Sequence, residues 1–395
     1  MQNQIEYYRA RGYFTIFICV PVHCSYTETY PDWDDIKAGM MELDADRIFF
    51  APIDDRRFVL GKYTGWVRHL FRGTALDWIV LTATSAKLPD DAFRLIRESH
   101  VALIDVNHVF TLGFAQRLLR RVVRAGRRVP IILETHDVQS HLLEERHELN
   151  PWTHRADKSG QLLNSEFSLL RHTRVLVHCS VDDFNFFKLQ LPHKPHVLAL
   201  PSIDEKFISK VDAACSTSDQ IDLLFVGQST DPNCTAMKWF FEEVWPLIAD
   251  RGYHVKIVGQ VDMLVRRDLP EIYRTFRSLF VGPIPELAPS YRAARCVFAP
   301  MVSGTGVSIK TVEALALGKP FVGTSKAFRG MPMDRLEKAG LRAHDTPREF
   351  ADAIVDALSR EQVASAASRA AYFGIFSKQS VFASRDEALK IATAK

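Results

Sequence analysis

Residues 303–321 read SGTGVSIKTVEALALGKPF, and they contain the side chains whose types and spacing could do chemistry. Lys310 and Glu313 stand three positions apart, so on a helix they share one face. Gly304 and Gly306 precede them in a short loop, where glycines let backbone N–H groups approach an anion closely. A lysine supplies a positive charge for a diphosphate, and a glutamate offers two acceptor oxygens to the paired hydroxyls of a ribose. The stretch therefore predicts a grip for a nucleoside diphosphate.

The elements expected around this pair are those of a ligand site in an α/β protein. Ile309, Val312 and Ala316 recur at the spacing of one helix face, which we expect to pack on a sheet. The preceding strand ends at Pro300, so the loop lies at a strand's carboxyl end, where open α/β sheets bind ligands. The helix N-terminus adds partial positive charge. The residues alone leave a second interpretation open, in which the lysine and glutamate form a surface ion pair beside an ordinary turn.

Short β-branched or aromatic runs alternate with helical patterns along the chain, which favours an α/β fold with parallel sheets. Helices are expected at 90–98, 112–125, 158–170, 235–251 and 287–294, with a helical tail from 347. Strands are expected at 14–20, 47–52, 78–83, 101–106, 129–135, 174–179, 196–200, 222–227, 254–259, 278–282, 296–300 and 320–325.

The polar segment 201–220 lacks sustained periodicity and is expected to be a linker. We therefore expect an N-terminal Rossmann-like domain over 1–200, a C-terminal one over 221–370 and a helical tail over 371–395.

Composition narrows the class of protein. The 395 residues are 47% hydrophobic and 25% charged, as in a globular protein of two domains. A net charge of +3 argues against a nucleic-acid partner. The six cysteines show no CxxC pair and no metal-ligand spacing, which favours free thiols in a reducing compartment. No apolar run is long enough to span a bilayer and the first residues lack a signal peptide's apolar core, so a cytoplasmic location is expected.

The stretch 303–321 resembles the C-terminal nucleotide-sugar motif of the group 1 glycosyltransferases (glycosyltransferase family 4), which have the two-domain GT-B fold. The glycine loop, the lysine, the glutamate of VEALALG and the following GKPFVGT fall in family order. The likeness extends over roughly residues 1–375 and is most specific in the second half. It includes LLFVGQSTDPNCTAMKWFFEEVWPLI, VGPIPELAPSYRAARCVFAP, ILETHDVQ and NSEFSLLRHTRVLVHCSVDD, at 223–248, 281–300, 132–139 and 164–183.

The resemblance implies two Rossmann-like parallel-sheet domains facing across a cleft, the first on the acceptor side and the second binding the donor. It implies a retaining transferase that moves a sugar from a nucleotide-diphosphate sugar to an acceptor hydroxyl without a metal or other cofactor. The implied partners are the nucleotide-sugar donor and a glycan or lipid-linked acceptor, in cell-surface polysaccharide or glycolipid synthesis. Carried over by position, the implied catalytic residues are His136 and Lys310, and the implied donor-binding residues are Gly227, Ile284, Gly304, Thr305, Gly306, Lys310 and Glu313.

Three departures from the family pattern bear on this assignment. The family usually has a second glutamate eight residues before Glu313, where this chain has Thr305. Many members place an arginine after the FVG strand, where this chain has Gln228 and Ser229, so the diphosphate would rely more heavily on Lys310. The chain also begins like the end of the family's first helix followed by its second strand, so the first strand and its glycine loop are expected to be missing.

Several other candidates remain open on sequence grounds. His136 follows a strand and could contact the sugar or orient the acceptor, or it could only cap the next helix. His108, Asp137 and Glu166 are weaker candidates for the same region. A Cys/His nucleophile at residues 178–179 is set aside because no protease signature accompanies it.

The stretch 114–128 is apolar on one face and basic on the other. It could lie peripherally on the inner membrane, or it could be an ordinary crossover helix whose basic face is exposed to solvent. Two rival functions also remain: a nucleotide-sugar epimerase on the same scaffold, and a non-catalytic nucleotide-binding relative.

Overall fold

The computed structural model describes residues 1–20, 33–52, 75–123, 127–139, 141–142, 159–214 and 220–394. The chain forms two compact units. Unit 1 comprises Met1–Cys179, Asp183–Ala199 and Phe382–Lys395, and unit 2 comprises Ser180–Asp182 and Leu200–Val381.

This division differs from the expected one in two places. The expected linker 201–220, of which 215–219 lie outside the described residues, contains helix α10 (Glu205–Ala213) and belongs to unit 2. The expected separate tail is shared, since its last part clusters with unit 1.

The sheet of unit 2 is parallel throughout and has the strand order β9-β8-β7-β10-β11. Numbered within the unit this is 3-2-1-4-5, the order of a Rossmann-like half, and its direction reverses between β7 and β10. A ligand crevice is expected outside the carboxyl ends of these two central strands. The strands are β7 (Ile221–Val226), β8 (Val255–Val258), β9 (Phe280–Gly282), β10 (Ala294–Ala299) and β11 (Phe321–Gly323).

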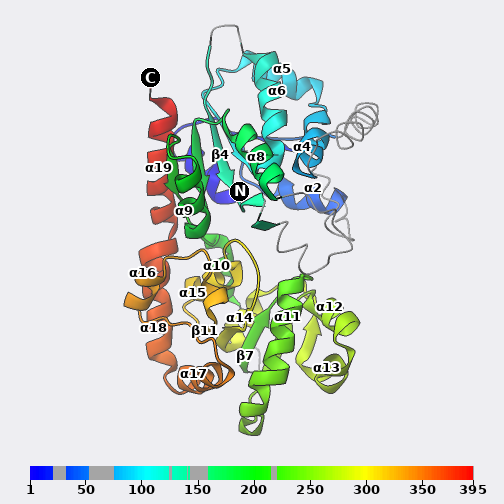
Figure 1. Ribbon diagram of the computed structural model, residues 1–395, viewed down its shortest axis with the longest axis vertical. Helices are drawn as coiled ribbons and strands as arrows, with labels where there is room; N and C mark the ends of the chain where they lie inside the picture. The colour runs from blue at the N-terminus through cyan, green and yellow to red at the C-terminus, as the bar shows by residue number, and fades with distance from the viewer. Residues whose placement is uncertain are drawn as a thin grey trace. The chain divides into compact units, whose positions relative to one another are not determined.

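Helices connect and cover these strands (Figure 1). The expected helix 235–251 begins earlier and keeps α geometry only to Trp239. A π turn (Phe240–Val244) and a 3-10 turn containing Pro246 follow, because proline cannot donate to the preceding turn. The α-helices are α11 (Asp231–Trp239), α12 (Val261–Asp268), α13 (Pro270–Thr275), α14 (Ala288–Ala293), α15 (Ile309–Ala316), α16 (Met333–Lys338), α17 (Pro347–Ser359) and α18 (Glu361–Ala371).

Unit 1 contains a four-stranded parallel sheet in the order β3-β4-β5-β6 and a separate parallel pair, β1 and β2. The strands are β1 (Ile16–Cys19), β2 (Arg47–Phe50), β3 (Ile104–Asn107), β4 (Ile131–Thr135), β5 (Val175–His178) and β6 (His196–Leu198). Its helices include α1 (Gln2–Arg9), α2 (Trp33–Met41), α4 (Ala75–Ser85), α5 (Asp90–Glu98), α6 (Leu112–Val122) and α8 (Ser159–Leu170). Most of α9 (Val181–Gln190) and α19 (Lys378–Thr393) also belongs to unit 1, whereas their first residues belong to unit 2.

The expected strand 78–83 is wrong, because these residues lie within helix α4. Leu76, Ile79, Val80 and Ala83 are buried at positions i, i+3, i+4 and i+7, which is the spacing of a helix face rather than of a strand. The other expected strands are present, most of them shortened at one or both ends.

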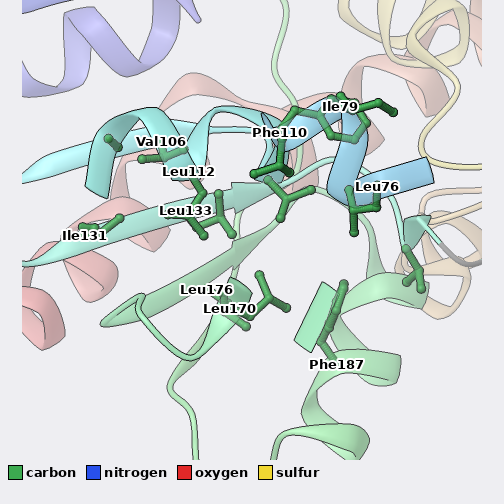
Figure 2. Packing of buried hydrophobic residues seen from close by; sticks show 14 of the residues in the cluster. Leu76, Ile79, Val106, Phe110, Leu112, Ile131, Leu133, Leu170, Leu176 and Phe187 are labelled. Atoms are coloured by element: carbon green, nitrogen blue, oxygen red, sulfur yellow. The ribbon is translucent and has the colours of Figure 1, made fainter. Parts of the chain in front are cut away.

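Strand alternation divides the core of unit 1 into two faces. Val106, Leu133 and Leu176 point to one face and pack with helices that include α4 and α6 (Figure 2). Ile132, Val175 and Val177 point to the other face, where they meet Ala388 and Ala392 of α19. The apolar side of α19 therefore belongs to the core of unit 1.

Candidate functional site

The loop between β10 and α15 has a backbone that requires glycine at two positions. Gly304 has a φ of 117° and Gly306 a φ of 63°, values that side-chain-bearing residues rarely adopt. The loop joins the carboxyl end of a central strand to the N-terminus of α15, as expected from the sequence.

Lys310, in the first turn of α15, reaches the segment that follows β7. Its Nζ donates a hydrogen bond to Asn233 Oδ1 at 2.5 Å and lies 4.2 Å from the centre of the Phe225 ring. Asn233 in turn donates from Nδ2 to the carbonyl oxygen of Gln228 at 2.9 Å. The two central strand ends are thus joined through one lysine.

Lys310 has an unusual protonation equilibrium. Burial, and secondarily the positive charge of Arg329, lower its pKa to about 7, while the charge of Glu313 opposes the shift. A lysine with such a pKa changes charge near neutral pH. An anionic ligand would restore the charged form, because an opposite charge raises the pKa of an ammonium group.

Glu313 lies one turn further along α15 and accepts a hydrogen bond of 2.6 Å from the hydroxyl of Tyr291. Burial raises its pKa, and the Tyr291 hydrogen bond and the charge of Lys310 partly offset that rise. Within the described residues no salt bridge joins Glu313 to Lys310, since each side chain is held by a different partner. The interpretation as a surface ion pair therefore does not describe these residues.

The remaining predicted donor residues are partly gathered at the same strand ends. Gly227 follows β7, and a Cβ there would lie 2.6 Å from the Phe225 ring and 3.3 Å from the Asn233 amide. The carbonyl of Thr305 accepts a hydrogen bond of 2.9 Å from Arg329 Nε. Ile284 is half-buried after β9, two strands away from β7, and its role stays a prediction.

In unit 1, His136 follows β4 and is oriented by a side chain at the end of β3. Its Nε2 lies 2.5 Å from Asn107 Oδ1, and the amide nitrogen of Asn107 donates to Gln4 at 2.9 Å. Because Oδ1 can only accept, Nε2 of His136 is assigned as the donor in this contact. The expected catalytic role of His136 stays a prediction.

His108 stacks parallel to His136, with ring centres 5.5 Å apart. It has a φ of 79°, the only positive value at a non-glycine residue among those described. Burial, with a smaller effect of His136, lowers its pKa to about 3, so it is neutral at physiological pH. Glu166, another weak candidate, is buried and accepts from the backbone nitrogen of Gln139 at 3.2 Å, which is a structural role.

The Cys/His pair at the end of β5 is unsuited to nucleophilic catalysis. His178 is buried between Thr135 Oγ1 at 2.7 Å and His196 Nδ1 at 2.9 Å, and burial lowers its pKa to about 3. Burial also raises the pKa of the Cys179 thiol, which suppresses the reactive thiolate.

Three residues at the site in unit 2 were not predicted from the sequence: Asn233, Tyr291 and Arg329. Tyr291 lies in the segment 281–300, which is part of the family resemblance, but its contact with Glu313 was not predicted. Asn233 and Arg329 have no local pattern that marks them, because their partners lie on other loops.

Within the described ranges, no group of three His, Cys, Asp or Glu side chains is arranged to hold a metal ion. In the same part of the chain, none of the helices combines the length and apolar composition needed to cross a bilayer.

Comparison with known proteins identifies the class. Residues 220–360 match the family model described as Glycosyl transferases group 1. No curated protein sequence matches the chain. Three similar solved structures are sucrose-phosphate synthase from Thermosynechococcus elongatus, Anabaena Alr3699/HepE in complex with UDP and glucose, and a glycosyltransferase from Rickettsia africae ESF-5.

The first has a TM-score of 0.59 and 13% identity, over 98% of this chain and 90% of that chain. HepE has a TM-score of 0.57 and 14% identity, over 98% of this chain and 95% of that chain. The Rickettsia protein has a TM-score of 0.56 and 12% identity, over 100% of this chain and 94% of that chain. The chain has the fold class of the GT-B glycosyltransferases. More particularly, residues 220–360, which match the group 1 glycosyltransferase model, contain the glycine loop, Lys310 and Glu313.

Proposed function

We propose that the protein transfers a sugar, with retention of anomeric configuration, from a nucleotide-diphosphate sugar to an acceptor hydroxyl. One observation carries the proposal. A half-buried lysine and a half-buried glutamate lie on one short helix that starts at a glycine loop beside the topological switch point of the sheet. Retention is an inference from the family resemblance.

The chemistry follows from where charge develops. As the bond between sugar and diphosphate breaks, negative charge grows on the leaving diphosphate, and protonated Lys310 with the N–H groups of the loop would stabilise it. Glu313, oriented by Tyr291, would accept hydrogen bonds from the ribose hydroxyls. The HepE structure contains UDP and glucose, so UDP-sugars are the first donors to test.

The decisive experiment measures release of nucleoside diphosphate from a panel of nucleotide sugars, with and without acceptor extracts. Lys310→Ala should lower kcat, because it removes charge that acts on the leaving group. Glu313→Gln should mainly raise KM for the donor. Lys238→Ala, at an exposed position of α11, serves as the matched control and should behave like wild type. Wild-type rates in both site variants would refute the assignment.

The arm without acceptor separates the rival functions. Conversion of the donor's sugar without release of nucleotide would indicate an epimerase. The departures at Thr305 and Gln228 favour a non-catalytic relative as the second candidate. That candidate would bind nucleotide diphosphates but turn over no donor with any acceptor.

A glycan or lipid-linked acceptor in surface polysaccharide synthesis, reached in the cytoplasm at the inner membrane, completes the proposal. Arg120 and Arg121 of α6 are exposed, whereas Phe114 and Leu118 are buried in the core of unit 1. Any membrane contact of α6 would therefore be electrostatic. Cosedimentation with vesicles that contain anionic lipid, compared with neutral vesicles, tests this contact. Arg124, another arginine of the basic stretch 114–128, lies outside the described residues.

A further inference from the structure

Arg329 lies against the glycine loop. It directly follows the 3-10 turn Ser325–Phe328, and its Nε donates to the carbonyl of Thr305 at 2.9 Å. One of its terminal nitrogens donates to the carbonyl of Lys326 at 2.8 Å. These two contacts orient the guanidinium against the loop.

The guanidinium occupies the space that a side chain at Gly304 would take. A Cβ at Gly304 would stand 3.2 Å from the central guanidinium carbon. A side chain at residue 304 would crowd the guanidinium, so the positive group lies close against the backbone of the loop. Its charge also acts on Lys310, whose pKa it lowers, so both cations belong to one electrostatic neighbourhood.

The position of Arg329 is fixed by the residue that follows it. Gly330 donates from its backbone nitrogen to Asp182 Oδ2 at 3.0 Å, and its carbonyl accepts from the backbone nitrogen of Val181 at 2.8 Å. Both partners belong to the segment Ser180–Asp182 of unit 2. The turn that presents the arginine is thus hydrogen-bonded to this segment at the residue after Arg329, which helps to preorganise the side chain.

A second and independent observation also indicates a ligand at this loop. The hydroxyls of Ser303 and Ser308, at the two ends of the loop, are buried and have no hydrogen-bond partner among the described residues. Ser308 is the N-cap of α15, yet its side chain caps no backbone N–H group. Buried hydroxyls are normally hydrogen-bonded, and an anion's oxygens would satisfy such donors.

We propose that Arg329 is the second cationic ligand of the diphosphate, and that it takes the part of the arginine that this chain lacks after β7. The inference rests on the proposed donor site. Lys310 and Arg329 would flank the diphosphate, while the loop between Ser303 and Ser308 provides its neutral donors. Arginine suits this position because its planar group can donate two parallel hydrogen bonds to phosphate oxygens.

The test uses the purified full chain and calorimetry. A thermal-shift panel of UDP, GDP, ADP, CDP and inorganic pyrophosphate first selects the diphosphate that binds wild type. No binding by any of these would refute the proposed function itself, and the role of Arg329 with it. With a binding diphosphate in hand, Arg329→Gln should weaken its affinity about ten- to a hundredfold, the effect of a lost hydrogen bond to a charged group. The free nucleoside should lose little affinity.

Two further variants separate charge from bracing of the loop. Arg329→Lys retains the charge but not the paired hydrogen bonds, so it should lose less diphosphate affinity than Arg329→Gln. Equal losses in the two variants would show that Arg329 only braces the loop and would overturn the proposal. Arg342→Gln, at an exposed position of unit 2, should match wild type. Wild-type diphosphate affinity in Arg329→Gln would also overturn the proposal. The pH midpoint of nucleotide-sugar binding adds a readout, because removing a neighbouring positive charge should move the Lys310 titration to higher pH.

One measurement needs no substitution at Arg329, which covers the case in which those variants fail to fold. In Lys310→Met the arginine remains, so the residual affinity for the diphosphate should still fall as KCl is raised. Salt-independent residual binding would overturn the proposal.

Discussion

The pKa of Lys310 makes donor affinity depend on pH in a direction that can be worked out. Free Lys310 has a pKa of about 7, and a bound diphosphate should raise it well above that value. Binding then needs a protonated lysine, so affinity is full below the free pKa and is lost as pH rises above it. The apparent Kd follows the factor 1 + 10^(pH − pKa). Between about pH 6 and about pH 9 it should therefore increase about 90-fold, or about 2.7 kcal/mol.

A nucleotide sugar is the right ligand for this measurement, because its diphosphate diester does not titrate in the range, whereas a free nucleoside diphosphate does. Calorimetry in buffers of different ionisation enthalpy should also show uptake of about 0.9 proton at about pH 8. Lys310→Arg keeps its charge throughout and should give a flat profile, while Lys238→Met should keep the wild-type profile. A wild-type Kd that stays constant from pH 6 to 9 would refute the reasoning.

Three further predictions concern groups whose partners the structure identifies. Arg385→Met leaves two buried carboxylates without their cation and should lower the free energy of unfolding by about 3–5 kcal/mol in urea titrations. The control Arg11→Met removes the cation of an exposed pair and should lower it by about 0.2–1 kcal/mol. Equal losses in the two variants would contradict the prediction. His178 has a pKa of about 3 in the folded state and stays neutral there, whereas in the unfolded state it takes up a proton below about pH 6.5. The free energy of unfolding should therefore fall by about 2 kcal/mol between about pH 7.5 and 5 because of this residue. His178→Gln should remove that part of the acid sensitivity. Tyr291→Phe frees Glu313 from its oriented position and should raise the Kd of the donor about fivefold, corresponding to about 1 kcal/mol, with kcat unchanged; a loss confined to kcat would exclude an orienting role.

The part of the site that could be predicted lies in one short stretch. The spacing of Lys310 and Glu313, the two glycines and the following strand are all local, so sequence patterns are enough to place them at a strand's carboxyl end. Asn233 is 77 residues from Lys310 and meets it only because β7 and β10 are neighbours in the sheet. No local sequence pattern indicates that β7 and β10 are neighbours in the sheet. Arg329 was missed for the same reason.

The errors in the fold have a common physical origin. The stretch 78–83 is apolar enough for a strand, and only the spacing of its buried neighbours within 76–83 shows a helix. Helix α19 was predicted as a helix, but periodicity does not say which sheet its apolar face covers. Arg385 supplies that information, since it contacts Asp105 and Glu134 on β3 and β4. A long-range ion pair therefore decides a domain boundary that local sequence cannot.

The lowered pKa of Lys310 and the nearby charge of Arg329 together indicate which anions the site should prefer. At about pH 8, protonating Lys310 costs about 1.4 kcal/mol, because its charge is half-buried and faces a second cation. A monophosphate carries its charge on a single phosphate group, so it would offset only part of this cost. A diphosphate carries two charges on adjacent phosphates, so it can meet the lysine with one and the arginine with the other. The site should therefore discriminate in favour of diphosphates over monophosphates.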